Sequence, residues 1–148
     1  MAITVRLLPS DARDVDYGTF EQLLLLASLP VPDLMESGRF FAIEDDRGLV
    51  GFGGLEGEVP DQMIRSVAVA PGLRHRGFGH AIVPRLIEQA RTEGAERLWL
   101  LTTSAQEFFE DLGWKVVDRQ DAPEVVSRTR LFCELCLPEA ALMLRVLG

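Results

Sequence analysis

The hydrophobic and polar residues of the chain follow two periods, which predicts a mixture of strands and helices. Residues 4–8 alternate as a strand does, and residues 17–27 carry apolar side chains at the spacing of one helix face. By the same criteria, further strands are expected at 39–45, 49–56, 63–70, 97–101, 114–118 and 141–146, and further helices from Phe78 to Gly94, at 105–112 and at 123–129. Strand, loop, helix and strand follow one another in the middle of the chain, an order that predicts an α/β fold with a mixed sheet.

Glycine positions refine this pattern around the second and third predicted strands. The turn signal at residues 46–48 joins these two strands and indicates a hairpin. Gly51, Gly53 and Gly54 weaken the later strand of the pair. Glycines inside a strand often mark a bulge or the close approach of another backbone, and we expect one of these features here.

The composition is that of an acidic protein of ordinary domain size. The chain has 148 residues, which is typical of one compact domain. Fifteen Lys and Arg against 23 Asp and Glu give a net charge of −8, which argues against a nucleic-acid surface, because that requires clustered positive charge. The longest purely apolar run, at 23–27, is far shorter than the roughly 20 residues that cross a bilayer. The N-terminus also lacks the pattern of a signal peptide, so a cytoplasmic protein without membrane contacts is expected.

Two cysteines, Cys133 and Cys136, stand as C-x-x-C near the end of the chain. A zinc site needs about four Cys, His or carboxylate ligands, and both histidines, His75 and His80, lie more than fifty residues upstream. We therefore expect no metal and favour two buried or half-buried thiols without chemistry. A redox or soft-metal role for the pair is the alternative.

The loop at 74–79 lies between a predicted buried strand and a predicted helix, and it is basic and rich in glycine. Glycines leave room for an anion beside the backbone, and N–H groups at a helix start attract phosphate oxygens. A Walker loop would need a lysine in the motif, but the one lysine of the chain, Lys115, lies elsewhere. A dinucleotide fingerprint would need a third glycine where Ile82 stands. The loop therefore indicates a phosphate-bearing ligand of another kind.

Two stretches of the sequence resemble signatures of one known family. The loop Arg74-His75-Arg76-Gly77-Phe78-Gly79 resembles the acetyl-CoA loop of the GNAT superfamily of N-acetyltransferases, and Val67-Ala68-Val69-Ala70-Pro71 resembles the strand beside the pantetheine in that family. Residues 105–114 are similar to a second signature of the family. The resemblance covers nearly the whole chain and implies a single GNAT domain at 1–148. The fold would be a mixed sheet of six to seven strands flanked by helices, with strands splayed at the acetyl-CoA site.

The resemblance also implies which residues contact acetyl-CoA, the co-substrate. They come from the strand, from the loop and from two later positions: Val67, Ala68, Val69, Arg74, His75, Arg76, Gly77, Phe78, Gly79, His80, Thr102 and Phe109. The segment 74–91 holds four arginines and one glutamate, so positive charge is concentrated where the phosphates of CoA would bind. The partner would be a small-molecule amine, and relatives in the family are often homodimers.

Shorter stretches point to a narrower group within the family. Residues 29–34, 54–56, 65–71, 101–103 and 108–109 together resemble the branch of GNAT proteins found with arsenic-resistance genes. In a related branch the substrate is the amine of a glutamate-like phosphinic or arsinic amino acid. The resemblance implies an anionic, amino-acid-like substrate linked to arsenic or herbicide-type resistance. Two other classes stay open: a CoA-binding regulatory or degenerate module without turnover, and an arsenical-binding protein that uses the two thiols.

Members of the family transfer the acetyl group directly from the thioester to an amine. The donor to the carbonyl oxygen is a backbone N–H, which the resemblance places near Ser66 to Val69, so Ser66 and Val67 are candidate catalytic residues. Two positions depart from the family pattern: Phe109 replaces the usual tyrosine acid, and Met63 stands where many relatives carry a glutamate base. A CoA thiolate, with a pKa near the ~8.5 of a free thiol, can leave without a dedicated acid.

Three further side chains are candidates for the substrate side. Glu56 is the candidate substitute base, which would also contact the substrate, and a solvated strand-end carboxylate is the equal alternative. Arg65 is the candidate anchor for an anionic substrate, since on a strand it would share a face with Val67, toward the acetyl group. An ion pair with an acid is the alternative for Arg65. Thr102 is expected either to bind cofactor or substrate or to cap the next helix.

Overall fold

The structure is a computed structural model that describes residues 3–8, 15–26, 38–70, 79–129, 132 and 139–147. The strands and helices predicted from the hydrophobic pattern are present in the predicted order. The helices are α1 (Val15–Leu26), α2 (Gly79–Glu93), α3 (Gln106–Asp111) and α4 (Glu124–Ser127), and a 3₁₀ turn, η1 (Arg119–Asp121), precedes α4. The strands are β1 (Thr4–Leu7), β2 (Arg39–Asp45), β3 (Gly48–Glu56), β4 (Asp61–Val69), β5 (Arg97–Thr102), β6 (Lys115–Val117) and β7 (Ala141–Val146).

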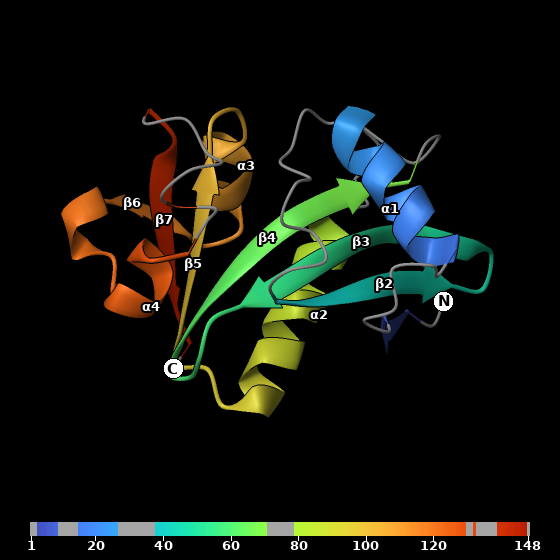
Figure 1. Ribbon diagram of the computed structural model, residues 1–148, viewed down its shortest axis with the longest axis horizontal. Coiled ribbons are helices and arrows are strands. Elements are labelled where there is room, and N and C mark those ends of the chain that lie inside the picture. Colours follow the sequence, from blue (N-terminus) through green and yellow to red (C-terminus); the bar gives the residue numbers. More distant parts are fainter. Residues whose placement is uncertain are drawn as a thin grey trace.

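The seven strands found in the described residues form one mixed sheet in the order β1-β2-β3-β4-β5-β7-β6. The central pair, β4 and β5, is parallel, and the other neighbours are antiparallel. The central pair is in register only from Asp61 opposite Arg97 to Met63 opposite Trp99. Beyond these three rows the two strands diverge, so the sheet opens like a V (Figure 1). The fold implied by the resemblance, a mixed sheet with splayed strands, is confirmed.

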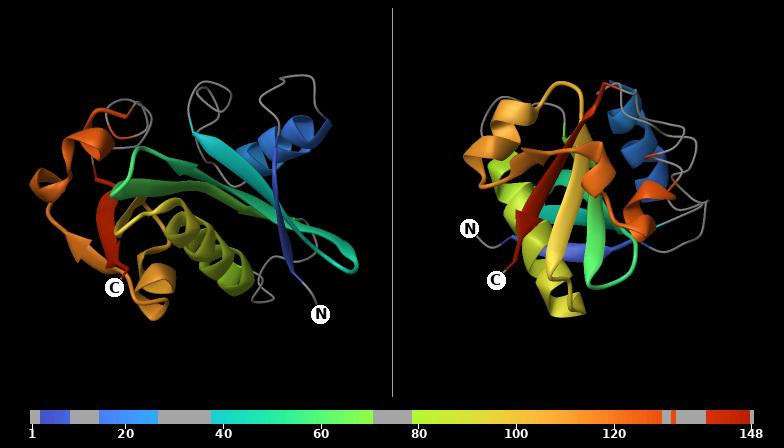
Figure 2. Two further views of the ribbon diagram at one scale, coloured as in Figure 1. Left: turned by 90° about the horizontal axis from the view of Figure 1, so that it is seen from below. Right: turned by 90° about the vertical axis from the view of Figure 1, so that its left-hand side faces the viewer.

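Helices cover both faces of the sheet. On one face, α2 and α3 bury the first core cluster, which includes Ile82, Leu86 and Phe109. On the other face, α1 packs on β2 to β4 through the second cluster, in which Phe20 stacks on Phe52. Figure 2 shows α1 and α2 on opposite sides of this part of the sheet. The arm of the V that contains β2 to β4 is thus enclosed between α1 and α2.

The glycines of β3 let neighbouring groups approach the strand closely, as the sequence predicts. A Cβ atom on Gly53 would lie 2.5 Å from Leu86 Cδ1 of α2, and one on Gly54 would lie 2.6 Å from Phe40 Cδ1. Such distances are too short for real contacts, so α2 packs against β3 in its observed position because no side chain intervenes.

Glycines also end two of the helices. Gly94 follows α2 with a φ of 102°, and Gly113 follows α3 with a φ of 94°. These left-handed conformations suit glycine, which has no Cβ to clash with the preceding turn. In the ranges that the structure describes, no helix is long and apolar enough to cross a membrane.

Candidate functional site

The middle of β4 carries a bulge opposite Gly53. The register between β3 and β4 shifts there, so that Ser66 and Val67 together oppose one residue of β3. Ser66 has a φ of 57°, in the left-handed region. This conformation costs roughly 1–2 kcal/mol for a residue with a side chain. Such strain persists only where the surrounding structure holds it, so the neighbours of Ser66 must stabilise this conformation.

The bulge lies on the edge of β4 that faces the open side of the V. The Ala70 N–H donates to the Val50 carbonyl of β3 at 2.8 Å. Because successive N–H groups of an antiparallel strand point alternately to its two sides, those of Val67 and Val69 point away from β3 and toward the diverging β5. Among the described residues, the pairing of β4 with β5 ends at Met63. These two N–H groups are therefore placed to donate to a ligand between the strands.

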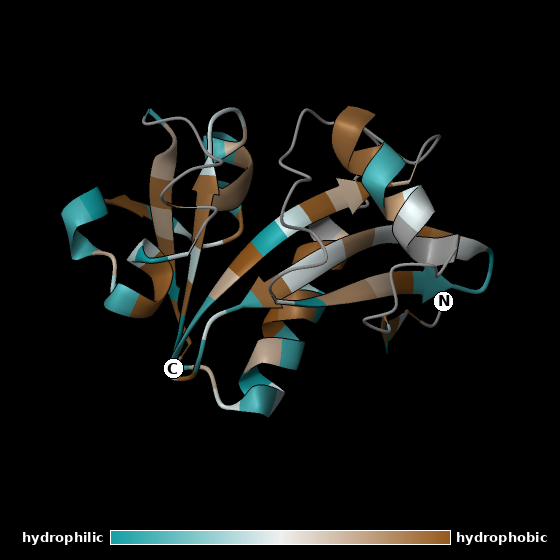
Figure 3. Cartoon of the chain, in the orientation of Figure 1, coloured by the Kyte–Doolittle hydropathy of each residue, from teal (hydrophilic) through white to brown (hydrophobic). Residues whose placement is uncertain are grey.

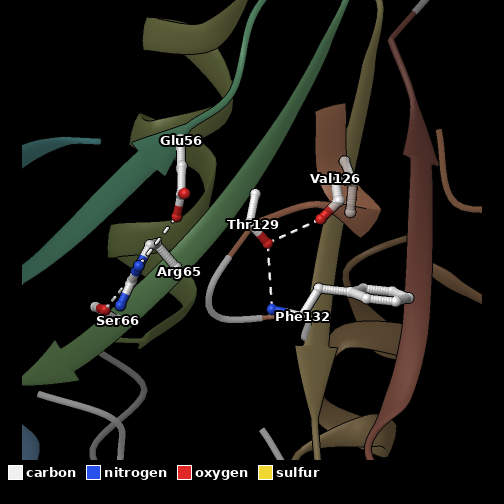
Figure 4. A network of polar contacts seen from close by, with 6 residues as sticks. All are labelled: Glu56, Arg65, Ser66, Val126, Thr129 and Phe132. Carbon is white, nitrogen blue, oxygen red and sulfur yellow. Dashed lines mark hydrogen bonds and ion pairs between the residues drawn. The ribbon is translucent and has the colours of Figure 1, made fainter. Parts of the chain in front are cut away.

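A buried polar cluster, formed by Glu56, Arg65 and Ser66, lies beside the bulge (Figure 4). Arg65 Nη1 donates to Glu56 Oε1 at 3.0 Å, and Arg65 Nε donates to Ser66 Oγ at 3.1 Å. The Arg65 side chain is 0% exposed and the Glu56 side chain 10%. The Arg65 Cζ atom also lies 5.7 Å from the centroid of the Phe40 ring. The ion pair that was the alternative for Arg65 is present, and its partner is the candidate base.

The expectation that Arg65 and Val67 share one face of β4 is wrong. Val67 packs against the first core cluster, on the α2 face, whereas Arg65 lies over Phe40, a member of the second cluster on the α1 face. Residues i and i+2 share a face only on a regular strand, and the extra residue of the bulge, Ser66, shifts the alternation. Ala68 consequently lies on the Arg65 face, in the second cluster.

The polar cluster lies between two apolar clusters on the α1 side of the sheet. The second cluster, beneath α1, includes Phe40 and Ala68, and the third, beneath α4, consists of Met63, Trp99, Val126 and Leu142. Figure 3 shows a hydrophilic band in the middle of β4, flanked by hydrophobic stretches. A charge in such surroundings is tolerated only when it is paired, as Arg65 is.

The segment around α4 is tied down by hydrogen bonds next to this cluster. Thr129 Oγ1 donates to the Val126 carbonyl at 2.8 Å and accepts from the Phe132 N–H at 3.2 Å (Figure 4). Arg119 donates to the carbonyls of Ala140 at 3.0 Å and Phe132 at 3.4 Å, and its Cζ lies 4.5 Å from the Phe132 ring centroid. These contacts, which the sequence did not predict, connect α4 and η1 to Phe132 and to Ala140, the residue before β7.

Three positions singled out in the sequence have structural roles. Thr102 Oγ1 accepts the Ala105 N–H at 3.0 Å in the turn before α3. Ala105 is the N-cap residue of this helix and no side-chain hydrogen bond caps it, so the capping role expected as one alternative is not observed. Phe109 is buried in the first core cluster, with its ring centroid 5.0 Å from that of Phe108 and 5.8 Å from that of Trp114. Met63 is also buried, so two positions where proton-transferring side chains are usual in the family hold core residues.

A polar cluster that sequence analysis missed links β4 and β5 where these strands are paired, at the closed end of the V. Arg97 Nε and Nη2 donate to the two carboxylate oxygens of Asp61 at 2.7 and 3.0 Å, and Trp99 Nε1 donates to the same carboxylate at 2.9 Å. Burial would raise the pKa of Asp61, but hydrogen bonds from Arg97 and Trp99 and the charge of Arg97 outweigh it, so the pKa lies below its usual value. No local motif marks these residues, since they become neighbours only when β4 pairs with β5.

Several predicted residues lie outside the described part of the chain. They include loop residues 74–78 and the cysteines Cys133 and Cys136. Gly79, the last residue of the predicted loop, is the first residue of α2, and His80 follows it. Of the predicted strand, loop and helix, the structure thus describes the strand, β4, and the helix, α2, in the predicted order. Among the described residues, no three His, Cys, Asp or Glu side chains are grouped so that they could hold a metal ion.

Comparison with known sequences identifies relatives of the central part of the chain. Residues 36–116 match the family described as Acetyltransferase (GNAT) domain. The amino-acid acetyltransferase of Aeromonas salmonicida is 31% identical over 100 residues, which cover 66% of this chain and 22% of that protein. The chain therefore matches only about a fifth of the length of this relative.

Solved structures with the same fold cover almost the whole chain. Rv2747 from Mycobacterium tuberculosis, solved in complex with CoA, has a TM-score of 0.74 at 24% identity and covers 98% of this chain and 99% of its own. N-acetylglutamate synthase from Neisseria gonorrhoeae, complexed with CoA and L-arginine, has a TM-score of 0.73 at 22% identity and covers 99% of this chain and 33% of its own. At these identities the likeness shows the fold, and the family match covers more than half of the sequence. The chain belongs to the GNAT acetyltransferase family.

Proposed function

We propose that the chain is an N-acetyltransferase that moves the acetyl group of acetyl-CoA to the amine of an amino acid. The observation that carries the proposal is the open edge of β4 at the bulge, where the N–H groups of Val67 and Val69 face the space between the diverging strands. Fixed donors of this kind stabilise the negative charge that develops on a carbonyl oxygen during acyl transfer. Relatives named amino-acid acetyltransferase support the substrate class, and neighbours solved with CoA support the co-substrate.

The proposed reaction is a direct transfer in which the chain orients both reactants. The amine nitrogen forms a bond to the thioester carbon and loses a proton to water or to the candidate base Glu56, and the carbon–sulfur bond breaks to release the CoA thiolate. The Val67 N–H, which follows Ser66 in the bulge, is the proposed donor to the carbonyl oxygen. Phe109 offers no proton, so the thiolate leaves unprotonated, which its pKa of ~8.5 permits.

The proposed acetyl-CoA site joins the β4 edge to the loop before α2. Val67, Ala68 and Val69 form the edge, residues 74–78 are the loop expected from the sequence, and Gly79 and His80 begin α2. Backbone N–H groups at a helix start and the arginines of the loop suit the phosphates of CoA. Thr102 and Phe109 stay proposed contacts from the resemblance. Within the protein, Thr102 accepts a hydrogen bond in the turn before α3, and Phe109 is a core residue.

The proposed acceptor is anionic and resembles an amino acid. The likeness to the branch found with arsenic-resistance genes extends this proposal to a glutamate-like phosphinic or arsinic amino acid. The relatives described above support only the broader class, an amino acid. A panel of acceptors that includes both kinds separates the broad proposal from the narrow one.

Release of CoA in the presence of candidate amines tests the proposed function. The protein is incubated with acetyl-CoA and each of the common amino acids, together with a phosphinic analogue of glutamate. We expect free thiol and N-acetylated product to appear in equal amounts for one amino acid or a small group of them. Mass spectrometry of the product distinguishes transfer from hydrolysis of the thioester. If acetyl-CoA raises the melting temperature but no amine is acetylated, the chain is the alternative, a CoA-binding module without turnover, which the apolar, buried Phe109 and Met63 favour.

The pH dependence of a Glu56→Gln variant tests the candidate base. A general base produces an acidic limb in the profile of kcat/KM, and its removal costs about 10²–10⁴ in rate and abolishes that limb. Because Glu56 is already paired with Arg65, we expect the variant to keep the limb at the same pH. Loss of the limb would instead identify Glu56 as the base.

A further inference from the structure

We infer that Arg65 is a positioning residue that, held by Glu56, keeps Ser66 in its left-handed conformation and thereby fixes the direction of the Val67 N–H. The inference rests on the proposed function, in which that N–H meets the thioester carbonyl. It differs from the expectation that Arg65 binds the substrate, since Arg65 acts here on the backbone of its own strand.

The contact between Arg65 and Ser66 is specific for the bulged strand. Neighbouring residues of a regular strand point their side chains to opposite faces, so an arginine could not reach the hydroxyl of the next residue. The distance of 3.1 Å between Arg65 Nε and Ser66 Oγ is possible because Ser66 has a φ of 57°. A bond that forms only in one conformation favours that conformation, and a charged donor makes it stronger than a neutral one.

The guanidinium of Arg65 is itself held by neighbours on the same face of the sheet. Glu56 lies opposite Met63, two residues from Arg65, so its carboxylate is a diagonal neighbour within reach of Nη1. Gly54 of β3 pairs with Phe40 of β2 on one side and with Arg65 of β4 on the other. Gly54 has no side chain to separate them, and the ring and the guanidinium meet over it. Arg65 is thus fixed by an ion pair and a ring contact.

Burial shows why Arg65 acts through Ser66. Its side chain is 0% exposed, and both hydrogen bonds described above end on groups of the protein. The N–H of Val67 belongs to the peptide bond that joins Ser66 to Val67. A rotation about the backbone bonds of Ser66 would therefore turn this N–H away from the open side of the V. The positioning effect is therefore expected in catalysis and in the backbone conformation of residue 66.

Two substitutions of Ser66 separate the hydroxyl from the backbone conformation. Ser66→Ala removes the hydrogen bond and retains the steric penalty of a left-handed residue, whereas Ser66→Gly also removes the hydrogen bond but adopts a positive φ without that penalty. We expect Ser66→Ala to lower kcat about tenfold with KM for acetyl-CoA within about twofold, and Ser66→Gly to retain at least about three times the kcat of Ser66→Ala. Ser127→Ala, a serine replacement in α4, is the matched control and keeps wild-type kcat. If Ser66→Gly is as slow as Ser66→Ala, the inference is overturned.

A rescue experiment extends the test to Arg65. Arg65→Lys keeps a positive charge for Glu56 but has no Nε–H at the position of the present donor. We expect kcat to fall about tenfold in Arg65→Lys and to recover at least threefold when Ser66→Gly is added. If Arg65→Lys is folded and the addition of Ser66→Gly does not raise its kcat, the inference is contradicted. The Ser66 variants leave the Arg65–Glu56 pair in place, so they decide the question if Arg65→Lys does not fold.

A measurement without turnover separates this inference from the proposed function. The Cα chemical shift and the three-bond H–N–C–H coupling of residue 66, recorded by NMR, report its φ. We expect a left-handed value in the wild type and in Ser66→Gly, and an extended value in Ser66→Ala. An unchanged left-handed value in both Ser66→Ala and Arg65→Lys would overturn the positioning role even if acetyl transfer is observed. If no amine is acetylated, the proposed function fails while these spectra still decide the conformation.

Discussion

Replacing Gly77 by Asp is expected to weaken CoA binding by about a hundredfold or more. In the proposed site Gly77 leaves space for phosphate oxygens next to backbone N–H groups, and a side chain at this position would fill that space. The new carboxylate would also face the phosphates. Like charges brought together cost several kcal/mol, and about 1.4 kcal/mol corresponds to a tenfold loss of affinity. Isothermal titration calorimetry with CoA measures the loss directly.

Two further variants make the loop experiment specific. Gly18→Asp places the same side chain on α1, where a Cβ atom would have no neighbour within 4 Å, and we expect it to bind CoA as the wild type does. Gly77→Ala adds bulk without charge, so its affinity is expected to lie between those of wild type and Gly77→Asp. Wild-type affinity in Gly77→Asp would refute the assignment of this loop to the phosphates of CoA.

Local patterns in the sequence were sufficient to predict the elements of the fold. The period of apolar residues located every strand and helix of the described chain to within a few residues, because each element buries one face. Gly94 and Gly113 marked helix ends through their backbone conformations. The glycines of β3 marked the site where α2 packs closely and where β4 bulges. These signals act within one element or between adjacent ones.

The arrangement of the candidate site depends on contacts that no local pattern reveals. The face on which Arg65 lies was predicted wrongly because one extra residue, Ser66, shifts the alternation of β4. The pairing of Arg65 with Glu56 follows from the register of β3 and β4, which the sequence does not specify. The proposed carbonyl donor is a backbone N–H, so no side-chain type marks it. Only the bulge distinguishes Val67 from other residues of an ordinary strand.

Replacing Asp61 by Ala is expected to lower the free energy of unfolding by about 3 kcal/mol at neutral pH. The change removes a carboxylate that accepts two hydrogen bonds from Arg97 and one from Trp99. A buried donor left without an acceptor costs about 1–3 kcal/mol, and a hydrogen bond to a charged group contributes about 1.5–3 kcal/mol. The Arg97 side chain is 41% exposed and regains water, which limits the loss to the lower part of the combined range. Equilibrium unfolding in urea measures the difference.

A control with an exposed ion pair tests whether the loss of stability depends on the burial of the carboxylate. Glu88→Gln breaks the pair between Arg85 and Glu88 on α2, whose side chains are 40% and 65% exposed. Exposed pairs of this kind contribute about 0.5 kcal/mol or less, so we expect little change in stability. Asp61→Asn keeps an oxygen acceptor for Trp99 while removing the charge, and its stability is expected to lie between those of wild type and Asp61→Ala. Equal losses in Glu88→Gln and Asp61→Ala would contradict the buried role of Asp61.

The contribution of Asp61 to the free energy of unfolding is expected to decrease at low pH, because the pKa of Asp61 is lowered in the folded state. Hydrogen bonds and the charge of Arg97 hold the folded-state pKa of Asp61 below its value in the unfolded chain, which is about 3.9. The folded state therefore binds the proton less readily, and the stabilisation is fully present above the unfolded-state pKa. It is lost as the pH falls through the folded-state pKa, since wild-type Asp61 then becomes neutral. Urea unfolding at pH 7, 5 and 3.5 should show the difference between wild type and Asp61→Ala unchanged between the first two and smaller at the third. Because Asp61 and Arg97 join β4 to β5 where the V begins, a difference independent of pH would mean that this junction does not depend on the charge of Asp61.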